Sequence, residues 1–269
     1  MSPSVKDELL RIGVRPSKER GQNFLIEAGV IDSILEFGKP EVAKHLVEIG
    51  PGLGALTREL ASFGRVSVIE IEEKFCDYLE ANVPNLDIYN ADVRFFDFSE
   101  IGSELVVFGN LPYSFSTEII FRLVDEAQNI KRAVLLLQKE FAERLAAKPG
   151  GRDYGTLTIN AQLWADVRLG PVVPGDCFHP PASVHSQVVE LRFRSEPRYP
   201  ISNSFLFKRF VKAAFFRRRK KILNSLNASQ AFADVDLTEL FSQAQIDFNR
   251  RPEELSIEEY ARIASFLDL

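Results

Sequence analysis

The feature that most constrains the fold is a regular alternation, between residues 46 and 138, of apolar runs with amphipathic segments. Runs that are apolar on both faces and that alternate with helices are typical of a parallel sheet with helices on each side. We therefore predict an α/β fold with a Rossmann-like sheet. The strand-like runs cover residues 45–50, 65–71, 86–90, 104–110 and 131–138, and the helical spacing covers 55–64, 72–83 and 117–127. In the first of these helices, Leu56, Leu60 and Phe63 fall on one face.

Two more strands follow with no helix between them. The segment 153–165 has helical spacing, and the segments 166–174 and 186–194 have the pattern of strands joined by a Pro-rich loop. Because two successive strands need no crossover helix only when they are antiparallel, we predict an antiparallel pair at the edge of the sheet.

The composition changes after the last predicted strand. Residues 197–233 include nine Lys or Arg and no Asp or Glu. The remainder has helical spacing with short connections, and Ser256 and Glu259 have the spacing of a capping box ahead of an apolar stripe. We predict two domains, a sheet domain over residues 1–198 and a small all-helical domain over residues 199–269.

The composition excludes several classes of protein. The 269 residues are 45% hydrophobic, enough for a large core, and the net charge of −5 does not by itself indicate nucleic-acid binding. Cys76 and Cys177 are far apart and lack a partnering His pattern, so we expect two buried thiols in a reducing compartment and no metal site. No apolar run follows the first charges, and no stretch approaches the ~20 apolar residues of a membrane helix, so we expect a cytoplasmic protein without a signal peptide.

A glycine-rich loop joins the first predicted strand to its helix. In "VEIGPGLGALT", Gly50, Gly52 and Gly54 allow a tight turn and close approach of a ligand at the carboxyl end of the strand. The dinucleotide fingerprint has the spacing G-x-G-x-x-G, whereas the third glycine here comes one position early. Glu48, inside the strand, would repel a pyrophosphate and favour a ligand with a cationic centre.

Two more acids follow at strand ends. Glu70 ends the second strand, where a carboxylate can accept hydrogen bonds from both hydroxyls of a ribose. Asp92 ends the third strand and can accept a hydrogen bond from an adenine amino group. This pattern predicts a nucleoside site without phosphate-binding groups, which S-adenosylmethionine fits. The alternative is that both acids only cap the helices that follow them.

The fourth strand ends in the sequence "GNLPY". If the substrate is an exocyclic amine of a nucleobase, the Asn110 side-chain oxygen and the Leu111 carbonyl can accept its two hydrogens as the nitrogen becomes pyramidal. Pro112 fixes its own φ and biases Leu111 toward an extended conformation, which directs that carbonyl outward. Tyr113 offers a ring face on which a base can stack. The reaction is then a methyl displacement governed by alignment, with no strong general base.

A second aromatic residue is needed to sandwich the base. The candidate is Phe178, in "CFHPPASVHS" of the Pro-rich loop between the last two predicted strands (the late loop). The alternative is that it belongs to the core. The three His residues are isolated, and we expect them to be structural or on the surface.

Nearly the whole chain resembles a known family, the KsgA-type small-subunit rRNA adenine dimethyltransferases. The segments that carry the resemblance are "GQNFL" (21–25), "EIGPGLGALT", "VIEIE", "NADVRFFDF", "GNLPYSFST", "FHPPASVHSQVV" and "AFFRRRKKILNSL". Ser114 and Phe115 stand where relatives often have other small or branched residues, and His179 and His185 vary the late loop.

The resemblance implies a class I methyltransferase domain, a helical C-terminal domain and S-adenosylmethionine as the methyl donor. It implies N6,N6-dimethylation of two adjacent adenosines in the 3′-terminal hairpin of 16S rRNA during small-subunit assembly, and we expect a monomer. The cofactor residues that it implies are Asn23, Leu25, Gly50, Glu70, Asp92 and Asn110. The implied residues that hold the target base are Asn110, Leu111, Pro112, Tyr113 and Phe178.

A basic segment supplies the expected RNA contacts. The eight basic residues within fourteen positions are Lys208, Arg209, Lys212, Arg217, Arg218, Arg219, Lys220 and Lys221. At helical spacing, Phe207 and Phe210 face inward and leave most of the basic side chains for phosphates. The alternative is a solvated helix face.

Three other functions remain open at this point. The related large-subunit (23S) rRNA adenine methylase of the macrolide-resistance type is the nearest, but the arginine-rich C-terminal segment and Leu111 favour the small-subunit type. A nicotinamide-dependent oxidoreductase would bind NAD instead of S-adenosylmethionine. A catalytically silent assembly factor would not need the "NLPY" motif.

Overall fold

The computed structural model describes residues 4–16, 22–42 and 45–267. Contacts between residues divide the chain into two compact units. The first unit holds the residues up to 142 and residues 166–193, and the second holds 143–165 and the residues from 194 onward. The predicted boundary at residue 198 lies close to the division between Phe193 and Arg194. The predicted domain ranges stay a prediction. Residues 143–165, which we expected with the sheet, group with the helical unit because their apolar side chains pack in its core.

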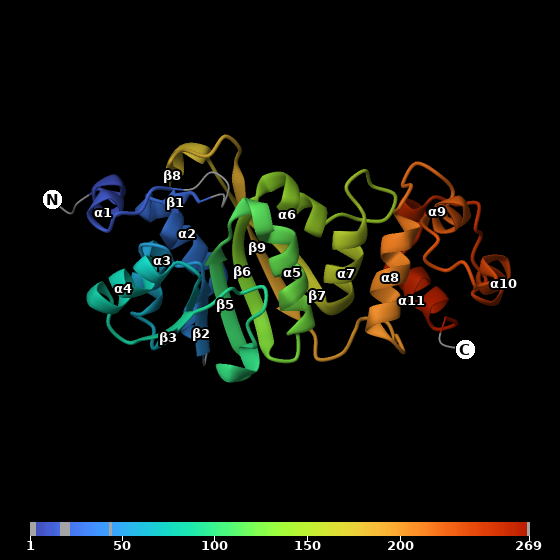
Figure 1. Ribbon diagram of the computed structural model, residues 1–269, viewed down its shortest axis with the longest axis horizontal. Coiled ribbons are helices and arrows are strands. Elements are labelled where there is room, and N and C mark those ends of the chain that lie inside the picture. The colour runs from blue at the N-terminus through green and yellow to red at the C-terminus, as the bar shows by residue number, and fades with distance from the viewer. Residues whose placement is uncertain (1–3, 17–21, 43–44, 268–269) are drawn as a thin grey trace. The chain divides into compact units, whose positions relative to one another are not determined.

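The first unit is built on a seven-stranded sheet with the order β4-β3-β2-β5-β6-β9-β7 (Figure 1). The strands are β2 (His45–Ile49), β3 (Val66–Glu70), β4 (Leu86–Asn90), β5 (Leu105–Asn110), β6 (Ile130–Gln138), β7 (Ala165–Val173) and β9 (Ser186–Phe193). From β4 to β6 all neighbours are parallel, and β9 runs antiparallel to β6. The predicted α/β sheet is confirmed, with the last two strands side by side at one edge.

Helices cover both faces of this sheet. The described helices up to residue 145 are α1 (Val5–Arg11), α2 (Ala28–Gly38), α3 (Ala55–Leu60), α4 (Glu73–Asn82), α5 (Ser116–Asp125) and α6 (Lys139–Leu145), which crosses the division after Ala142. α1 packs against Phe75 and Tyr78 of α4 rather than on the sheet. Short 3₁₀ turns are η1 (Pro40–Val42), η2 (Phe98–Glu100), η3 (Tyr113–Phe115) and η4 (Gly175–Cys177). Apolar side chains of α2, α3 and α4 share one core with alternate residues of the strands, such as Val106 and Phe108. The opposite face is covered by α5 (Figure 1).

A second, two-stranded sheet joins distant parts of the chain. β1 (Phe24–Leu25) pairs antiparallel with β8 (Phe178–His179), so that Phe24 lies opposite His179 and Leu25 lies opposite Phe178. This pairing brings the N-terminal segment to the late loop, and neither strand was predicted from the sequence.

Strand order locates the expected ligand site. β2 has β3 on one side and β5 on the other, so the chain reverses its direction of winding at β2. In open α/β sheets, ligands bind at the carboxyl ends of the strands beside such a reversal. The glycine loop, Glu70 and Asn110 all lie at this edge.

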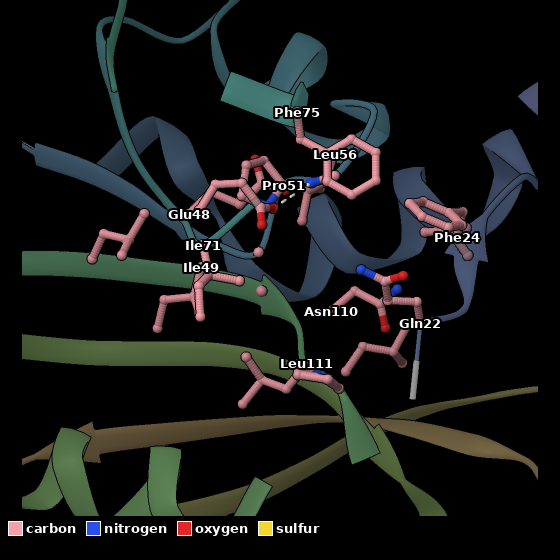
Figure 2. Close-up of a pocket in the computed structure, with 18 of the residues that line it drawn as sticks. Gln22, Phe24, Glu48, Ile49, Pro51, Leu56, Ile71, Phe75, Asn110 and Leu111 are labelled. Carbon is pink, nitrogen blue, oxygen red and sulfur yellow. Dashed lines mark hydrogen bonds between the residues drawn. The ribbon is translucent and has the colours of Figure 1, made fainter. Parts of the chain in front are cut away.

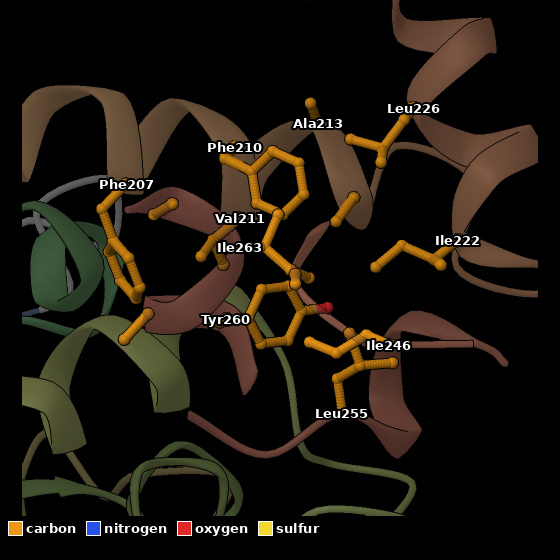
Figure 3. Close-up of a cluster of buried hydrophobic side chains, with 14 of the residues drawn as sticks. Phe207, Phe210, Val211, Ala213, Ile222, Leu226, Ile246, Leu255, Tyr260 and Ile263 are labelled. Atoms are coloured by element: carbon orange, nitrogen blue, oxygen red, sulfur yellow. The ribbon is translucent and has the colours of Figure 1, made fainter. Parts of the chain in front are cut away.

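The second unit is helical. It contains α7 (Thr156–Trp164), α8 (Ser204–Ala214), α9 (Ile222–Ser229), α10 (Leu237–Gln243), η5 (Pro252–Glu254) and α11 (Ile257–Ala264). Its core is rich in aromatic residues, with Phe207, Phe210 and Tyr260 fully buried (Figure 3). The predicted capping box is confirmed, since Ser256 Oγ accepts from the Glu259 amide at 3.1 Å and Glu259 Oε2 accepts from the Ser256 amide at 2.8 Å.

One predicted helix is shorter than expected, and one expectation about burial was wrong. Phe63 is 46% exposed because α3 ends at Leu60 and the chain turns before this residue. Cys177 is only half-buried, since it lies in the surface turn η4, whereas Cys76 is buried as expected. Among the described residues, no helix is both long and apolar enough to cross a membrane.

Candidate active site

A cavity of about 350 Å³ opens at the carboxyl ends of β2, β3 and β5 (Figure 2). This volume lies within the range of sites for small molecules. All six residues predicted to bind the cofactor line it, namely Asn23, Leu25, Gly50, Glu70, Asp92 and Asn110. Leu111, Pro112 and Tyr113 line it as well, so the structure brings both predicted groups together. Of "GQNFL", Gly21 lies outside the described residues.

The glycine loop lets the backbone form one wall of this cavity. Gly50, Gly52 and Gly54 have φ values of 65°, 54° and 75°, in the left-handed region that favours glycine. A Cβ atom at Gly54 would lie 2.7 Å from the Leu79 side chain, and one at Gly52 would lie 3.0 Å from the Phe24 ring. These positions therefore need glycine for close packing as well as for backbone conformation.

Glu70 is buried and holds the glycine loop. Its Oε2 accepts a hydrogen bond from the Gly52 amide at 3.2 Å, and its Oε1 accepts from the Glu72 amide at 2.9 Å. Burial raises the pKa of Glu70, and the two amides oppose that rise. The second contact lies at the start of α4, so Glu70 also satisfies a donor at that helix end, as the capping alternative expected.

Glu48 tests whether a cationic ligand fits this site. Its side chain is 2% exposed, and Oε2 has no hydrogen-bond partner among the described residues. Burial raises the pKa of Glu48 to about 8, and the charge of the nearby Glu70 adds to the rise. A buried carboxyl group without a partner is costly, and a cation bound in the cavity would relieve that cost. The residues therefore fit a donor that carries a sulfonium and an ammonium group.

Asp92 is paired with an arginine that the sequence reasoning missed. Arg94 Nε lies 3.0 Å from Asp92 Oδ1, and a terminal nitrogen of Arg94 lies 2.5 Å from Oδ2. Hydrogen bonding by Arg94 lowers the pKa of Asp92. The only sequence signal for this pair was that an acid and a base stand two positions apart directly after a predicted strand.

The side chain of Asn110 has a fixed orientation. Its Nδ2 donates to the Asn23 carbonyl at 2.8 Å, which leaves Oδ1 as the atom that can accept a hydrogen bond from a ligand. The Leu111 amide donates to the Leu136 carbonyl at 3.2 Å, and the Leu111 carbonyl accepts no hydrogen bond from any described residue. Two acceptor oxygens are thus available at adjacent positions.

The two aromatic residues predicted to hold a base are placed differently. Tyr113 lines the cavity, and its hydroxyl shares a 2.8 Å hydrogen bond with the Ser186 hydroxyl. Phe178 does not line the cavity. It is 1% exposed and packs in the core of the first unit, next to the β1 strand that it pairs with. Stacking by Phe178 would require its ring to leave this core.

Several apolar residues of the cavity were not predicted. Phe24, Ile71, Phe75 and Phe115 all line it, and Ile71 is 55% exposed directly after Glu70. A large apolar side chain exposed beside a nucleoside site suits a planar ring. The signal for Ile71 was its place after the acid that ends the strand. Phe24 reaches the cavity because β1 pairs with β8, and such a pairing of distant segments leaves no signal in the sequence around Phe24.

The basic segment is divided by its contacts within the second unit. Arg209 donates to the Ala231 carbonyl, Arg218 donates to the Arg152 and Tyr154 carbonyls, and Lys221 donates to Asn249. Lys208 is half-buried. The exposed basic residues whose side chains have no partner among the described residues are Lys212, Arg217, Arg219 and Lys220. No cluster of His, Cys, Asp and Glu among the described residues could hold a metal ion.

Comparison with known proteins identifies the family. The sequence model of the ribosomal RNA adenine dimethylase family matches residues 15–269. The chain belongs to this family. It is 39% identical over 250 residues to the ribosomal RNA small subunit methyltransferase A of Nitrosomonas europaea, covering 92% of this chain and 95% of the relative. It is 37% identical over 265 residues to the protein of the same name from Myxococcus xanthus, covering 97% and 94%.

Solved structures of relatives share the fold of this family member. A dimethyladenosine transferase from Plasmodium falciparum superposes with a TM-score of 0.74 at 25% identity, covering 91% of this chain and 97% of that one. The 23S rRNA methyltransferase ErmE gives a TM-score of 0.64 at 25% identity, covering 92% and 100%. The predicted fold class and the predicted enzyme, a methyltransferase of ribosomal RNA adenine that uses S-adenosylmethionine, are confirmed.

Proposed function

We propose that this chain transfers methyl groups from S-adenosylmethionine to N6 of two adjacent adenosines in the 3′-terminal hairpin of 16S rRNA. The substrate is the small ribosomal subunit or its precursor, and the enzyme acts in the cytoplasm as a monomer. The observation that carries the proposal is the fixed orientation of Asn110 in the cavity wall, next to Leu111: the Asn23 carbonyl holds its Nδ2, so Oδ1 is the atom that can accept from the substrate. The relatives named small subunit methyltransferase A support the choice of subunit.

The cavity supplies a place for each part of the donor. Glu70 would accept the ribose hydroxyls, Asp92 the adenine amino group, and Glu48 would face the cationic end, while Gly50 lets the backbone approach closely. S-adenosylmethionine supplies an electrophilic methyl group on sulfur. With the donor bound, the apolar walls of the cavity would keep water from this path.

The residues after β5 would act on the target base. An exocyclic amine is a poor nucleophile because its lone pair is delocalised into the ring. Asn110 Oδ1 and the Leu111 carbonyl would accept its two hydrogens and so favour the pyramidal nitrogen that attacks the methyl group. Tyr113 would stack on the base, which must leave its helix at a cost of a few kcal/mol. Phe178 would stack on the base only after its ring has left the core of the first unit.

The helical unit would bind the RNA backbone through Lys212, Arg217, Arg219 and Lys220. These four side chains are exposed and lack a partner among the described residues, whereas Arg209, Arg218 and Lys221 already bind groups of the chain. Phe216 is 60% exposed beside them and offers a ring for an unstacked base.

The proposal is tested with purified small and large ribosomal subunits that lack the modification. We expect the wild-type chain to methylate small subunits and to leave large subunits unmodified. Asn110→Ala should retain RNA binding and lose methyl transfer by about 10²–10³-fold, the usual effect of removing one transition-state partner. Asn82→Ala, at the exposed end of α4, is the matched control and should behave as wild type.

Two results would contradict the proposal. Modification of large subunits in place of small ones would establish the large-subunit type of activity. The 23S rRNA methyltransferase ErmE, whose structure is similar to that of this chain, is named for that activity. Full activity of Asn110→Ala would remove the role that we give to this side chain.

A further inference from the structure

Arg94 connects two parts of the site that the sheet order keeps apart. β4 and β5 are separated by β3 and β2. Asp92 follows β4, Phe115 follows β5, and both line the cavity together with Arg94. Since the Arg94 side chain contacts both of them, it spans the distance between the two strand ends.

The contact with Asp92 fixes a carboxylate. Asp92 Oδ1 accepts from the Arg94 amide and from Arg94 Nε, both at 3.0 Å. Asp92 Oδ2 accepts from the same Nε at 3.1 Å and from a terminal nitrogen at 2.5 Å. A planar guanidinium that binds both oxygens holds a carboxylate in one orientation, which a single point charge does not.

The contact with Phe115 reaches the target-base loop. The Arg94 guanidinium carbon lies 4.5 Å from the centre of the Phe115 ring, within the range of a cation–π interaction. Phe115 ends the η3 turn that begins at Tyr113, and its amide donates to the Pro112 carbonyl at 3.3 Å. Arg122 of α5 donates to the Phe96 carbonyl at 2.9 Å, so the loop after β4 is also attached to the helix that follows η3.

We propose that Arg94 is a positioning residue that couples recognition of the donor's adenine by Asp92 to the conformation of residues 110–115. The inference rests on the proposed function and extends it to a residue that touches neither reacting atom. When an adenine amino group binds Asp92, the guanidinium on the same carboxylate transmits its position to Phe115, and so to the loop that holds the target base.

A nearby ion pair provides the control. Arg65 also binds both oxygens of an aspartate, Asp87, but the two side chains are 69% and 37% exposed and do not line the cavity. Arg65→Met removes an arginine from a bidentate pair without touching the site. It should therefore leave donor binding and methyl transfer unchanged.

The first measurement is calorimetric binding of S-adenosylhomocysteine and of its 6-oxo analogue, which has no adenine amino group. Arg94→Met should weaken binding of S-adenosylhomocysteine about tenfold, the loss of one charge-assisted contact, and should leave binding of the 6-oxo analogue unchanged. Arg94→Lys keeps a charge near Asp92 and should stay within about threefold of wild type.

The second measurement separates the contact with Phe115. At saturating donor, Arg94→Lys and Phe115→Leu should each lower kcat on small subunits about tenfold, because neither retains the stacked guanidinium. In the ligand-free protein, the backbone amides of residues 110, 111 and 113–116 should exchange with deuterium faster in both variants than in wild type and in Arg65→Met.

The outcomes are distinguishable. If Arg94→Met binds both ligands as wild type does, or if Arg94→Lys retains the wild-type kcat and exchange rates, Arg94 has only a structural role and the inference is overturned. If the wild-type chain itself fails to bind S-adenosylhomocysteine or to methylate ribosomal RNA, the proposed function fails first.

Discussion

At the scale of single residues, the buried carboxyl groups decide what the cavity accepts. Glu48 and Glu70 lie on neighbouring strands and are nearly inaccessible, but only Glu70 has both oxygens bound by amides. Glu48 keeps one oxygen that has no hydrogen-bond partner in the described part of the chain. A site for phosphate would place amides and cations here, so this pair of acids is a reason why the glycine loop serves a nucleoside with a positive end.

The titration of Glu48 should be visible in the stability of the ligand-free protein. The pKa of Glu48 rises from 4.5 to about 8 in the folded state, mainly through burial, so the folded protein binds more protons than the unfolded chain between these values. The free energy of unfolding should therefore fall as the pH rises through this window. Glu48→Gln should remove the contribution of this group to that loss, which is on the order of 4 kcal/mol at pH 8.

Chemical denaturation at pH 5 and pH 8 measures this effect. Glu59→Gln, at an exposed position of α3, is the control and should follow the wild type. Equal loss of stability in Glu48→Gln and in wild type would show that Glu48 is not the titrating group.

At the scale of elements, some helices and strands are specified by adjacent residues, and others form only through contacts between distant segments. The last helix, α11, begins with a cap that four consecutive residues specify, and both hydrogen bonds of the capping box are present. β1 and β8, in contrast, form only because segments about 150 residues apart pair with each other. The position of Asn23, and through it the orientation of Asn110, depends on the second kind of element.

The cap of α11 carries a prediction about stability. Ser256→Ala removes the side-chain oxygen that accepts from the Glu259 amide, and it should lower the free energy of unfolding by about 1 kcal/mol. Thermal unfolding of the full chain measures the loss. Ser256→Asp keeps an acceptor at the cap and should restore most of it, whereas equal loss in both variants would assign the effect to something other than capping.

At the scale of the whole molecule, charge is separated along the chain. The net charge is −5, but residues 197–233 carry nine basic residues and no acid. Such a protein can bind RNA only if its positive charge is concentrated on a surface that phosphates reach. Within this basic stretch, the structure reduces the candidates to the four exposed side chains that have no partner among the described residues, Arg217 and Arg219 among them.

The salt dependence of RNA binding tests this surface. Combined replacement of Arg217, Arg219 and Lys220 by Ala should reduce the slope of log K against log salt by about 2, since each lost phosphate contact contributes about 0.7 to 0.9. Arg262→Ala, elsewhere in the helical unit, should change the slope little. If the triple variant keeps the wild-type slope, these side chains form only a solvated face.

The sequence by itself determined where the strands of the sheet lie along the chain, the glycine loop, the acid inside the first strand, the acids at or just after the ends of the next two strands and the "NLPY" motif, because each depends on a local period or on a few adjacent residues. Tertiary structure decided which side chains those motifs meet. No local pattern relates the segments that form three of these contacts. They are the stacking of Arg94 on the Phe115 ring, the hydrogen bond from Asn110 to the Asn23 carbonyl and the packing of Phe178 in the core. The physical reason is that propensity and capping act within a few residues, whereas burial and side-chain pairing depend on which distant segments the folded sheet brings together.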